Sequence, residues 1–496
     1  MKLYLTGHTY RYAVEQILTV LFPGEKPEYP ETPPDERDRF CRSALECGTD
    51  AVTARAQIGW DGVTAAGESR CPAPLPEEKL ERDRLLQRIL KQAIYKAAVE
   101  ILGAEPPWGA LSGIRPAKLA SKALEEERTE EETRTLFREV YFVSPSRTEL
   151  ALDAARAGLA AKRSLRPDEV SLYIGIPFCP SRCVYCSFVS ADMKRAMKLM
   201  EPFVAALHQE IDYAAGLLRE AGLYLRTVYM GGGTPTTLSA GQLDGILSHL
   251  QDAFDLSRLT ELTVEAGRPD TITPEKLAVL RRRGVTRVSV NPQSMEDNVL
   301  RAMGRAHTAA DILTAYQIVR DAGIPAVNMD LIAGLPEDTV EGFRGTLNQV
   351  LALDPENITV HTLALKKGSR LMLEQHRLPS GEETAAMLDY AWGALRQAGQ
   401  MPYYLYRQKY MSGALENIGW CKPGYEGLYN ICIMEELHTI LALGAGGSTK
   451  LTDPATGKIV RITNPKYPKE YIERIDRICA EKRPLVDFHR ALASRA

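Results

Sequence analysis

The chain has no long apolar segment and no surplus of either charge. Its 496 residues include 61 Lys and Arg against 64 Asp and Glu, which gives a net charge of −3. A nucleic-acid-binding chain is expected to be basic, so this balance argues against nucleic acid as a partner. No apolar run approaches the ~20 residues of a membrane span, and Met1 to His8 lack the apolar core of a signal peptide. We therefore expect a cytoplasmic protein with no membrane span.

Cysteine is also scarce, with nine residues. An odd and widely spread set argues against a disulfide framework and fits a compartment in which thiols stay reduced. Three of the nine lie within one stretch of eight residues. The other six show no ligand spacing among themselves, and we interpret them as structural thiols: Cys41, Cys47, Cys71, Cys421, Cys432 and Cys479.

The three clustered thiols form a C-x3-C-x2-C motif, Cys179, Cys183 and Cys186, directly after an apolar, strand-like run. A four-iron cluster held fully by protein uses four cysteines, and a structural zinc ion normally has four ligands. Three thiolates would leave one iron of a [4Fe-4S] cluster open, and a substrate or cosubstrate can bind there. Two alternatives remain open: a zinc site completed by a distant Cys or His, and three buried thiols with no ligand role.

Between residues 168 and 375, short apolar runs alternate with helical patterns. Each run is followed by a loop and then by an amphipathic stretch, so the pattern predicts a parallel sheet whose crossovers are helices. Such an α/β sheet, curled up, is a partial (β/α)6 barrel with its active site at the carboxyl ends of the strands. The six predicted strands are Ser171 to Ile176, Thr227 to Met230, Glu261 to Glu265, Arg287 to Val290, Ala326 to Ile332 and Asn357 to Leu363.

Polar or glycine residues recur where these predicted strands end. The second run leads into Gly231-Gly-Gly-Thr-Pro, the third ends in Glu265, the fourth is followed by Gln293, and the fifth contains Asp330. A single such residue is more often a turn, a helix cap or an ion-pair partner. Because they recur at the same edge as the cysteines, we predict that they surround one ligand.

The three-cysteine motif resembles that of the radical S-adenosylmethionine (SAM) superfamily. The strings Tyr-x-x-Ile-Pro-Phe-Cys, Gly-Gly-Gly-Thr-Pro-Thr, Val-Glu-Ala, Asn-Pro-Gln, Gly-Arg-x-His-Thr and Asp-Leu-Ile-x-Gly-Leu-Pro look like those of the oxygen-independent coproporphyrinogen III oxidase family. Two longer strings, which begin at Thr359 and Tyr403, are similar to the long HemZ branch of that family. The resemblance runs from about residue 110 to residue 450.

The resemblance implies a set of cofactor contacts. Cys179, Cys183 and Cys186 would ligate the [4Fe-4S] cluster, and the open iron would bind SAM. Contacts to that SAM would come from Tyr173, Gly232 and Glu265. A second SAM lies nearby in the family, and its counterparts here would be Gly233, Thr234, Gln293, Arg305, Asp330 and Ala364.

The same resemblance implies an oxidoreductase that oxidatively decarboxylates coproporphyrinogen III to protoporphyrinogen IX without oxygen. Its partners would be the tetrapyrrole substrate and a low-potential electron donor such as flavodoxin or ferredoxin. Coproporphyrinogen carries four propionates, which Arg and Lys bind well. We consider His307 and His361 either substrate-facing or structural. Candidate propionate ligands are Arg268, Lys366, Lys367, Arg407 and Lys409.

Two positions depart from the oxidase pattern. The well-supported bacterial oxidases have a further Cys where this chain has Phe188, and a histidine where it has Gly175. Both features are shared with the haem-chaperone-like branch, which lacks the oxidase activity. A haem-binding protein of that kind, or a radical SAM enzyme acting on another tetrapyrrole, therefore remains an alternative.

We expect three domains. Residues 1–165 would form an α+β domain with a strand from Lys2 to Leu5 and a helix from Glu81 to Leu102. Residues 166–375 would form the radical SAM core, after the polar, proline-containing break from Lys162 to Asp168. Residues 376–496 would form a mainly helical extension that covers the substrate.

Overall fold

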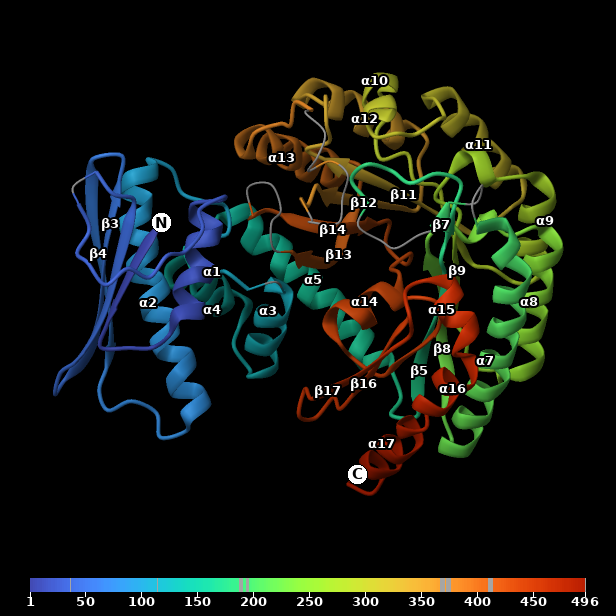
Figure 1. Ribbon diagram of the computed structural model, residues 1–496, viewed down its shortest axis with the longest axis horizontal. Helices are drawn as coiled ribbons and strands as arrows, with labels where there is room; N and C mark the ends of the chain where they lie inside the picture. Colours follow the sequence, from blue (N-terminus) through green and yellow to red (C-terminus); the bar gives the residue numbers. More distant parts are fainter. Residues whose placement is uncertain are drawn as a thin grey trace. The chain divides into compact units, whose positions relative to one another are not determined.

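The computed structural model describes residues 1–35, 37–113, 115–186, 191–192, 196–365, 371, 376–408 and 414–495 (Figure 1). The chain divides into two compact units. The first is Met1–Leu152 with Gly413–Leu415, and the second is Asp153–Ser412 with Glu416–Ala496. The second unit therefore contains both the predicted core and the predicted extension. The division into three domains at residues 165 and 375 stays a prediction.

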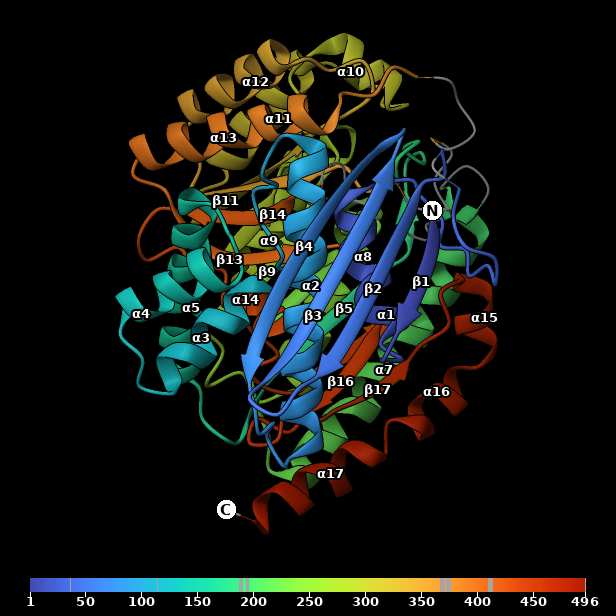
Figure 2. The same ribbon diagram turned by 90° about the vertical axis from the view of Figure 1, so that its left-hand side faces the viewer.

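The first unit contains a four-stranded sheet in the order β1-β2-β3-β4, in which β1 and β2 run parallel and the others antiparallel. Alternate residues of β3, from Val52 to Ile58, are buried, as expected for a sheet with one covered face. Figure 2 shows this sheet in front of α2. The elements are β1 (Lys2–Thr6), α1 (Arg11–Leu21), β2 (Phe40–Cys47), β3 (Ala51–Trp60), β4 (Val63–Pro72), α2 (Lys79–Leu102), α3 (Pro116–Glu125) and α4 (Glu130–Thr135).

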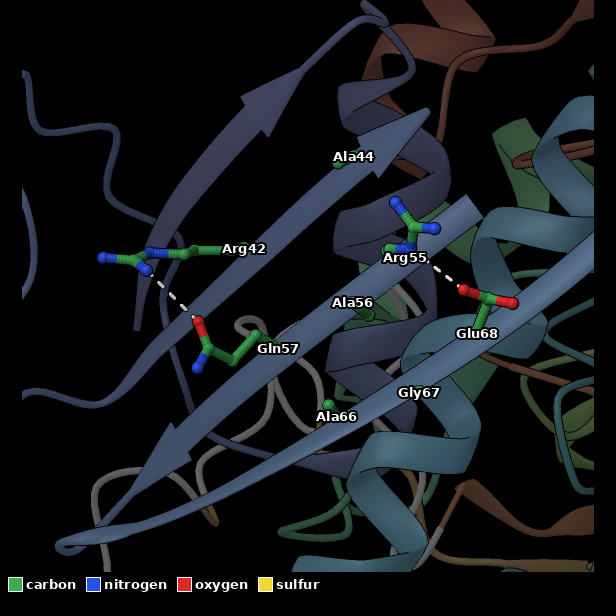
Figure 3. Close-up of a pocket in the computed structure, with 8 residues that line it drawn as sticks. All are labelled: Arg42, Ala44, Arg55, Ala56, Gln57, Ala66, Gly67 and Glu68. Atoms are coloured by element: carbon green, nitrogen blue, oxygen red, sulfur yellow. Dashed lines mark hydrogen bonds and ion pairs between the residues drawn. The ribbon is translucent and has the colours of Figure 1, made fainter. Parts of the chain in front are cut away.

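Eight residues of β2, β3 and β4 line a shallow hollow in this sheet (Figure 3). Arg42 Nη1 donates to Gln57 Oε1 at 3.2 Å, and Arg55 Nε donates to Glu68 Oε2 at 2.9 Å. These polar side chains are therefore bonded across the strands. The lining is completed by Ala44, Ala56, Ala66 and Gly67.

The second unit is built on the six predicted parallel strands, and all six are confirmed. They pair in chain order, each parallel to the next. Their burial is nearly continuous, because helices or other elements cover both faces of the sheet. The strands are β5 (Glu169–Ile176), β8 (Tyr224–Gly232), β9 (Glu261–Glu265), β10 (Arg287–Ser289), β11 (Ala326–Ala333) and β12 (Asn357–Thr362).

Helices connect these strands along the outer side of the sheet (Figure 1). Their ends follow local capping chemistry: the Ser239 side chain caps α8 through the backbone N–H of Gln242, and Thr308 caps α11 through Asp311. The connecting helices are α7 (Met200–Ala221), α8 (Ala240–Ala253), α9 (Pro274–Arg282), α10 (Asp297–Ala302), α11 (Ala309–Asp321) and α12 (Val340–Ala352). Helix α5 (Pro145–Ser164) precedes β5.

The C-terminal part adds strands to both edges of the same sheet. The full order in the described residues is β13-β14-β12-β11-β10-β9-β8-β5-β15-β16-β17, so the sheet is open at β13 and β17. We expected a mainly helical extension, and its described residues contribute strands as well as helices. The strands are β13 (Met401–Arg407), β14 (Glu416–Cys421), β15 (Ile440–Gly444), β16 (Ser448–Thr452) and β17 (Ile459–Thr463). The helices are α13 (Gly381–Gln397), α14 (Leu428–Glu435), α15 (Pro468–Glu473), α16 (Ile475–Glu481) and α17 (Pro484–Ala493).

None of the helices in the described ranges combines the length and apolar character needed to cross a bilayer.

Candidate functional site

The cysteine loop begins at the carboxyl end of β5. Cys179 lies on the short strand β6 (Phe178–Cys179), which pairs in parallel with β7 (Ala191–Asp192). Cys183 is 8% exposed, and its carbonyl accepts from the backbone N–H of Cys186 at 3.2 Å. Between them, the N–H of Val184 donates to the carbonyl of Met303 at 3.1 Å. The fold thus holds the loop at the edge where the predicted site residues meet.

The glycine segment after β8 passes directly beside this loop. The N–H of Gly233 donates to the carbonyl of Ile176, and that of Thr234 to the carbonyl of Phe178, both at 2.7 Å. Thr234 Oγ1 also lies 3.5 Å from Cys179 Sγ. A Cβ atom on Gly233 would stand only 2.5 Å from the Phe178 carbonyl oxygen, so glycine is required for this approach.

Glu265 lies at the end of β9 and accepts a hydrogen bond from Tyr229. The distance from Tyr229 Oη to Glu265 Oε1 is 2.6 Å. Burial raises the pKa of Glu265 to about 7, against the hydrogen bonds from Tyr229 and the Gly232 backbone, and the Asp330 carboxylate adds to the increase. The carboxyl group is therefore poised to change its charge near neutral pH.

Three tyrosine rings form a stack beside Glu265. The ring centroids of Tyr229 and Tyr429 lie 4.5 Å apart, and Tyr173 lies 6.3 Å from each of them. Sequence reasoning found only Tyr173. The β5–β8 register places Tyr229 opposite Tyr173, so its parity in the strand was a usable signal. Tyr429 comes from α14, and no local pattern connects that helix to β8.

Gln293 and Asp330 are brought together by the backbone. The N–H of Gln293 donates to the carbonyl of Asp330 at 2.9 Å, and Gln293 has a φ of 67°, which a non-glycine residue rarely adopts. Asn328 Nδ2 donates to Asp330 Oδ1 at 2.7 Å, and His361 Nε2 lies 3.9 Å from Asp330 Oδ2. The strained conformation at Gln293 fits a residue held for ligand contact.

Arg305 reaches back from the end of α10 toward the cysteine loop. It is 6% exposed, and its guanidinium donates to the carbonyl of Asn291 at 2.7 Å and to Tyr185 Oη at 3.4 Å. Several buried polar atoms in this region have no hydrogen-bond partner among the described residues: Asn291 Oδ1, Gln293 Oε1, Arg305 Nε and His307 Nδ1. Buried polar atoms are normally paired, so their concentration here indicates a polar ligand.

Comparison with known proteins identifies the family. Residues 173–350 match the Radical SAM superfamily. The oxygen-independent coproporphyrinogen-III oxidase-like protein HemZ of Bacillus subtilis is 41% identical over 385 residues, which is 77% of each chain. The chain belongs to the radical SAM, HemZ-like family. Heme chaperone HemW of Haemophilus influenzae is 29% identical over 305 residues, 61% of this chain and 76% of that protein.

A solved structure also resembles this HemZ-like chain. Coproporphyrinogen III oxidase (HemN) from Escherichia coli matches with a TM-score of 0.49 and 24% identity, over 65% of this chain and 72% of that chain.

The cofactors of the radical SAM family are a [4Fe-4S] cluster and SAM, and the donor set of this chain fits them. Three thiols on one loop would serve as cluster ligands, and the unpartnered polar atoms would form hydrogen bonds with a polar cosubstrate. The described residues contain no group of three His, Cys, Asp or Glu side chains close enough to hold a single metal ion. Cluster cysteines bind different iron atoms and are spaced more widely than the ligands of one ion. Which residues contact each cofactor stays a prediction.

The structure changes the interpretation of several further candidates. Arg268 is 4% exposed and is bonded beside the cysteine loop, and its role as a propionate ligand stays a prediction. Arg407 is 5% exposed, and His307 is 5% exposed next to Arg305. Ala364 is partly buried just after β12. Lys366, Lys367 and Lys409 lie outside the described residues, as does Phe188.

The raised pKa of Glu265 predicts a pH-dependent stability of the chain without cofactors. Below pH 4.5, the ordinary pKa of a glutamate, the Glu265 carboxyl is protonated in both the folded and the unfolded state, whereas above pH 7 the folded state must hold its charge in a half-buried position. Stability therefore falls as the pH rises from about 4.5 to about 7, by about 3 kcal/mol in total. We expect Glu265→Gln to be about 3 kcal/mol more stable than the parent chain at pH 8, and less than about 1 kcal/mol more stable at pH 5.

Denaturant unfolding at the two pH values measures this difference. Glu382→Gln, on the exposed first turn of α13, is the control and should show the same small change at both. If the gain in stability of Glu265→Gln over the parent chain did not increase between pH 5 and pH 8, the raised pKa of Glu265 would be contradicted.

Proposed function

We propose that this radical SAM protein oxidatively decarboxylates coproporphyrinogen III to protoporphyrinogen IX under anaerobic conditions. The proposal is supported by its 41% identity to a protein named as coproporphyrinogen-III oxidase-like. One structural observation carries it: the cysteine loop, the glycine segment, Glu265 and the Gln293–Asp330 pair converge at one edge of the sheet. That convergence supports one shared cofactor site of the kind that the family resemblance implies.

The residues at this edge have distinct proposed roles. Cys179, Cys183 and Cys186 would ligate the cluster. Tyr173, Gly232 and Glu265 would hold the SAM on the open iron, with the Glu265 carboxylate accepting hydrogen bonds from ribose hydroxyls once it is ionised. A second SAM would contact Gly233, Thr234, Gln293, Arg305, Asp330 and Ala364.

When bound, the cluster and SAM supply one-electron chemistry that removes a hydrogen atom from the β carbon of a propionate. The propionate would then lose carbon dioxide and pass one electron to a one-electron acceptor, which would leave a vinyl group, so two propionates would consume two SAM. The chain orients the cosubstrate through Glu265 and keeps water away from it with the tyrosine stack. In the cytoplasm, a low-potential donor such as flavodoxin or ferredoxin would supply the electron, and residues 376–496 would cover the tetrapyrrole.

Anaerobic turnover tests the proposal. The reconstituted chain is incubated with coproporphyrinogen III, SAM and reduced flavodoxin, and products are identified by mass spectrometry. We expect loss of two carboxyl groups per tetrapyrrole and two molecules of 5′-deoxyadenosine per product. Cleavage of SAM without any vinyl product would contradict oxidase activity, and a different modified tetrapyrrole would identify another substrate.

A haem-binding role is the second candidate. Its support is the relative named heme chaperone and the presence of Phe188 where the oxidases have a further Cys. Under this role the chain would bind haem stoichiometrically and pass it to an apoprotein. Absorbance titration with haem, followed by transfer to a haem-free acceptor protein, distinguishes the two functions.

A further inference from the structure

Arg268 is a buried arginine that the cofactor contacts implied by the family do not use. It follows β9 by three residues and lies at the start of the short 3-10 helix Pro269–Thr271. Its side chain is 5% exposed, although an arginine at the end of a strand is usually solvated. Burial of a charged group is costly unless partners compensate it, so the surroundings of the guanidinium should show what it serves.

The guanidinium of Arg268 is bonded to the cysteine loop. Both terminal nitrogens donate to Ser181 Oγ at 3.2 Å, and Nη1 also donates to the Ser181 carbonyl at 3.4 Å. The same Nη1 lies 3.9 Å from Cys183 Sγ. The Arg268 side chain therefore contacts the backbone of the cysteine loop and also one of the three predicted ligand sulfurs.

The remaining face of the guanidinium pairs with Asp270. Arg268 Nε lies 3.1 Å from Asp270 Oδ1, and Nη2 lies 3.3 Å from Oδ2, which is a two-point contact. The Asp270 side chain is 36% exposed, so solvent screens the negative charge of its carboxylate. The carboxylate thus fixes the orientation of Arg268 and neutralises it incompletely.

A second buried guanidinium leaves this region with excess positive charge. Arg305 Nη1 lies 3.5 Å from His307 Nε2, and His307 Nδ1 lies 3.9 Å from Asp270 Oδ1. Burial lowers the pKa of His307 to about 4, so its ring is neutral at pH 7. Both guanidiniums are buried, whereas the carboxylates of Asp270 and Asp311 that act on this group are exposed, so water screens their negative charges. Three thiolates around a reduced cluster would provide the negative charge that compensates these two buried guanidiniums.

We infer that Arg268 is a positioning residue for the cluster: it holds the loop at Ser181 and raises the reduction potential through its charge beside Cys183. A fixed cation near a ligand sulfur, donating a hydrogen bond to it, favours the reduced and more negative cluster. Reduction is the step on which SAM cleavage depends. The inference rests on the cluster alone and not on the substrate, so it holds for an oxidase and for a haem carrier.

A redox titration of the reconstituted full chain, followed by electron paramagnetic resonance without SAM, tests this. In Arg268→Met, the equilibrium constant for one-electron reduction should fall about ten- to a hundred-fold, which lowers the midpoint by about 60 to 120 mV. Arg268→Lys keeps the positive charge but loses the planar guanidinium and its paired hydrogen bonds. Its midpoint should therefore lie between those of the parent chain and Arg268→Met. Asp270→Asn removes the opposing carboxylate and should shift the midpoint upward.

The matched control is Arg283→Met. Arg283 also makes a two-point pair with an aspartate, Asp244, at 2.7 and 3.1 Å, on the outer helices of the same unit. Its removal should leave the midpoint unchanged. A purely structural role for Arg268 would lower the iron content of Arg268→Met and leave the midpoint of the loaded fraction at the parent value.

Two results would overturn the inference. One is an Arg268→Met midpoint within a factor of two of the parent equilibrium constant, which is about 20 mV. The other is an unchanged or lower midpoint in Asp270→Asn, and this result decides the matter if Arg268→Met takes up no cluster. Neither measurement involves a tetrapyrrole, so failure here is distinguishable from failure of the proposed function.

Discussion

Replacing Cys183 by alanine is expected to abolish cluster binding. Cys183 is the most buried of the three clustered thiols, and the loop that follows it is held by the Cys186–Cys183 and Val184–Met303 backbone hydrogen bonds. Two thiolates cannot hold a cluster that already has one open iron. Iron and sulfide after anaerobic reconstitution should fall about ten-fold or more below the parent chain, and SAM cleavage should be lost with them.

Cys479→Ala is the matched control for this change. Cys479 is also buried, at 4% exposure, and lies on α16 away from the cysteine motif in the sequence. Both variants remove one sulfur from the interior, so both should lose a similar, small amount of stability, on the order of 1 kcal/mol. Only Cys183→Ala should lose iron. Normal iron content in Cys183→Ala would remove the basis for the cofactor assignment.

The second large effect is expected for Gly233→Ala. The added Cβ would stand 2.5 Å from the Phe178 carbonyl oxygen and 2.9 Å from both the Ile176 carbonyl oxygen and the Phe178 nitrogen. These are backbone atoms, so the segment can move only by breaking the two 2.7 Å hydrogen bonds of Gly233 and Thr234. Overpacking and the two lost bonds together should cost about 3 kcal/mol or more.

The same displacement would move Thr234 away from Cys179, so cluster and SAM binding should weaken along with stability. Gly245→Ala provides the control, because Gly245 lies inside α8 and an added Cβ would meet no heavy atom within 4 Å. That change should stabilise the chain by about 0.5 to 1 kcal/mol. Denaturant unfolding and equilibrium dialysis with SAM measure both effects. Equal stability of the two variants would contradict the close approach.

The strands of the core could be predicted because parallel strands covered on both faces are continuous apolar runs in the sequence. Glu169–Ile176 and Ala326–Ala333 are examples. Once those strands are parallel, Glu265, Gln293 and Asp330 must end at one edge, so the location of the site followed from chain order alone.

The direction of a long side chain could not be predicted in this way. Arg268 was a candidate propionate ligand, because an arginine fork binds carboxylates well and the implied substrate carries four of them. Its burial depends on Pro269–Thr271 turning the chain so that the guanidinium meets Ser181 and Asp270. That turn and the position of Ser181 are separated by more than eighty residues, so no local pattern contains the contact.

Chain order was also no guide to the edges of the sheet. β14 lies between β12 and β13, and β15 pairs with β5 from some 270 residues away. These pairings depend on which backbone edges remain free after the core has formed. They place α14, and with it Tyr429, against the tyrosines of β5 and β8.

The amino-acid sequence by itself determined the cysteine spacing, the order of the parallel strands and the glycines beside them, because each depends on residues close together in the chain. Only the tertiary structure decided which side chains from distant segments reach that edge: Tyr229 and Tyr429 beside Glu265, and Arg268 beside Cys183. The physical reason is that burial and charge depend on every neighbour in space, and packing alone selects those neighbours.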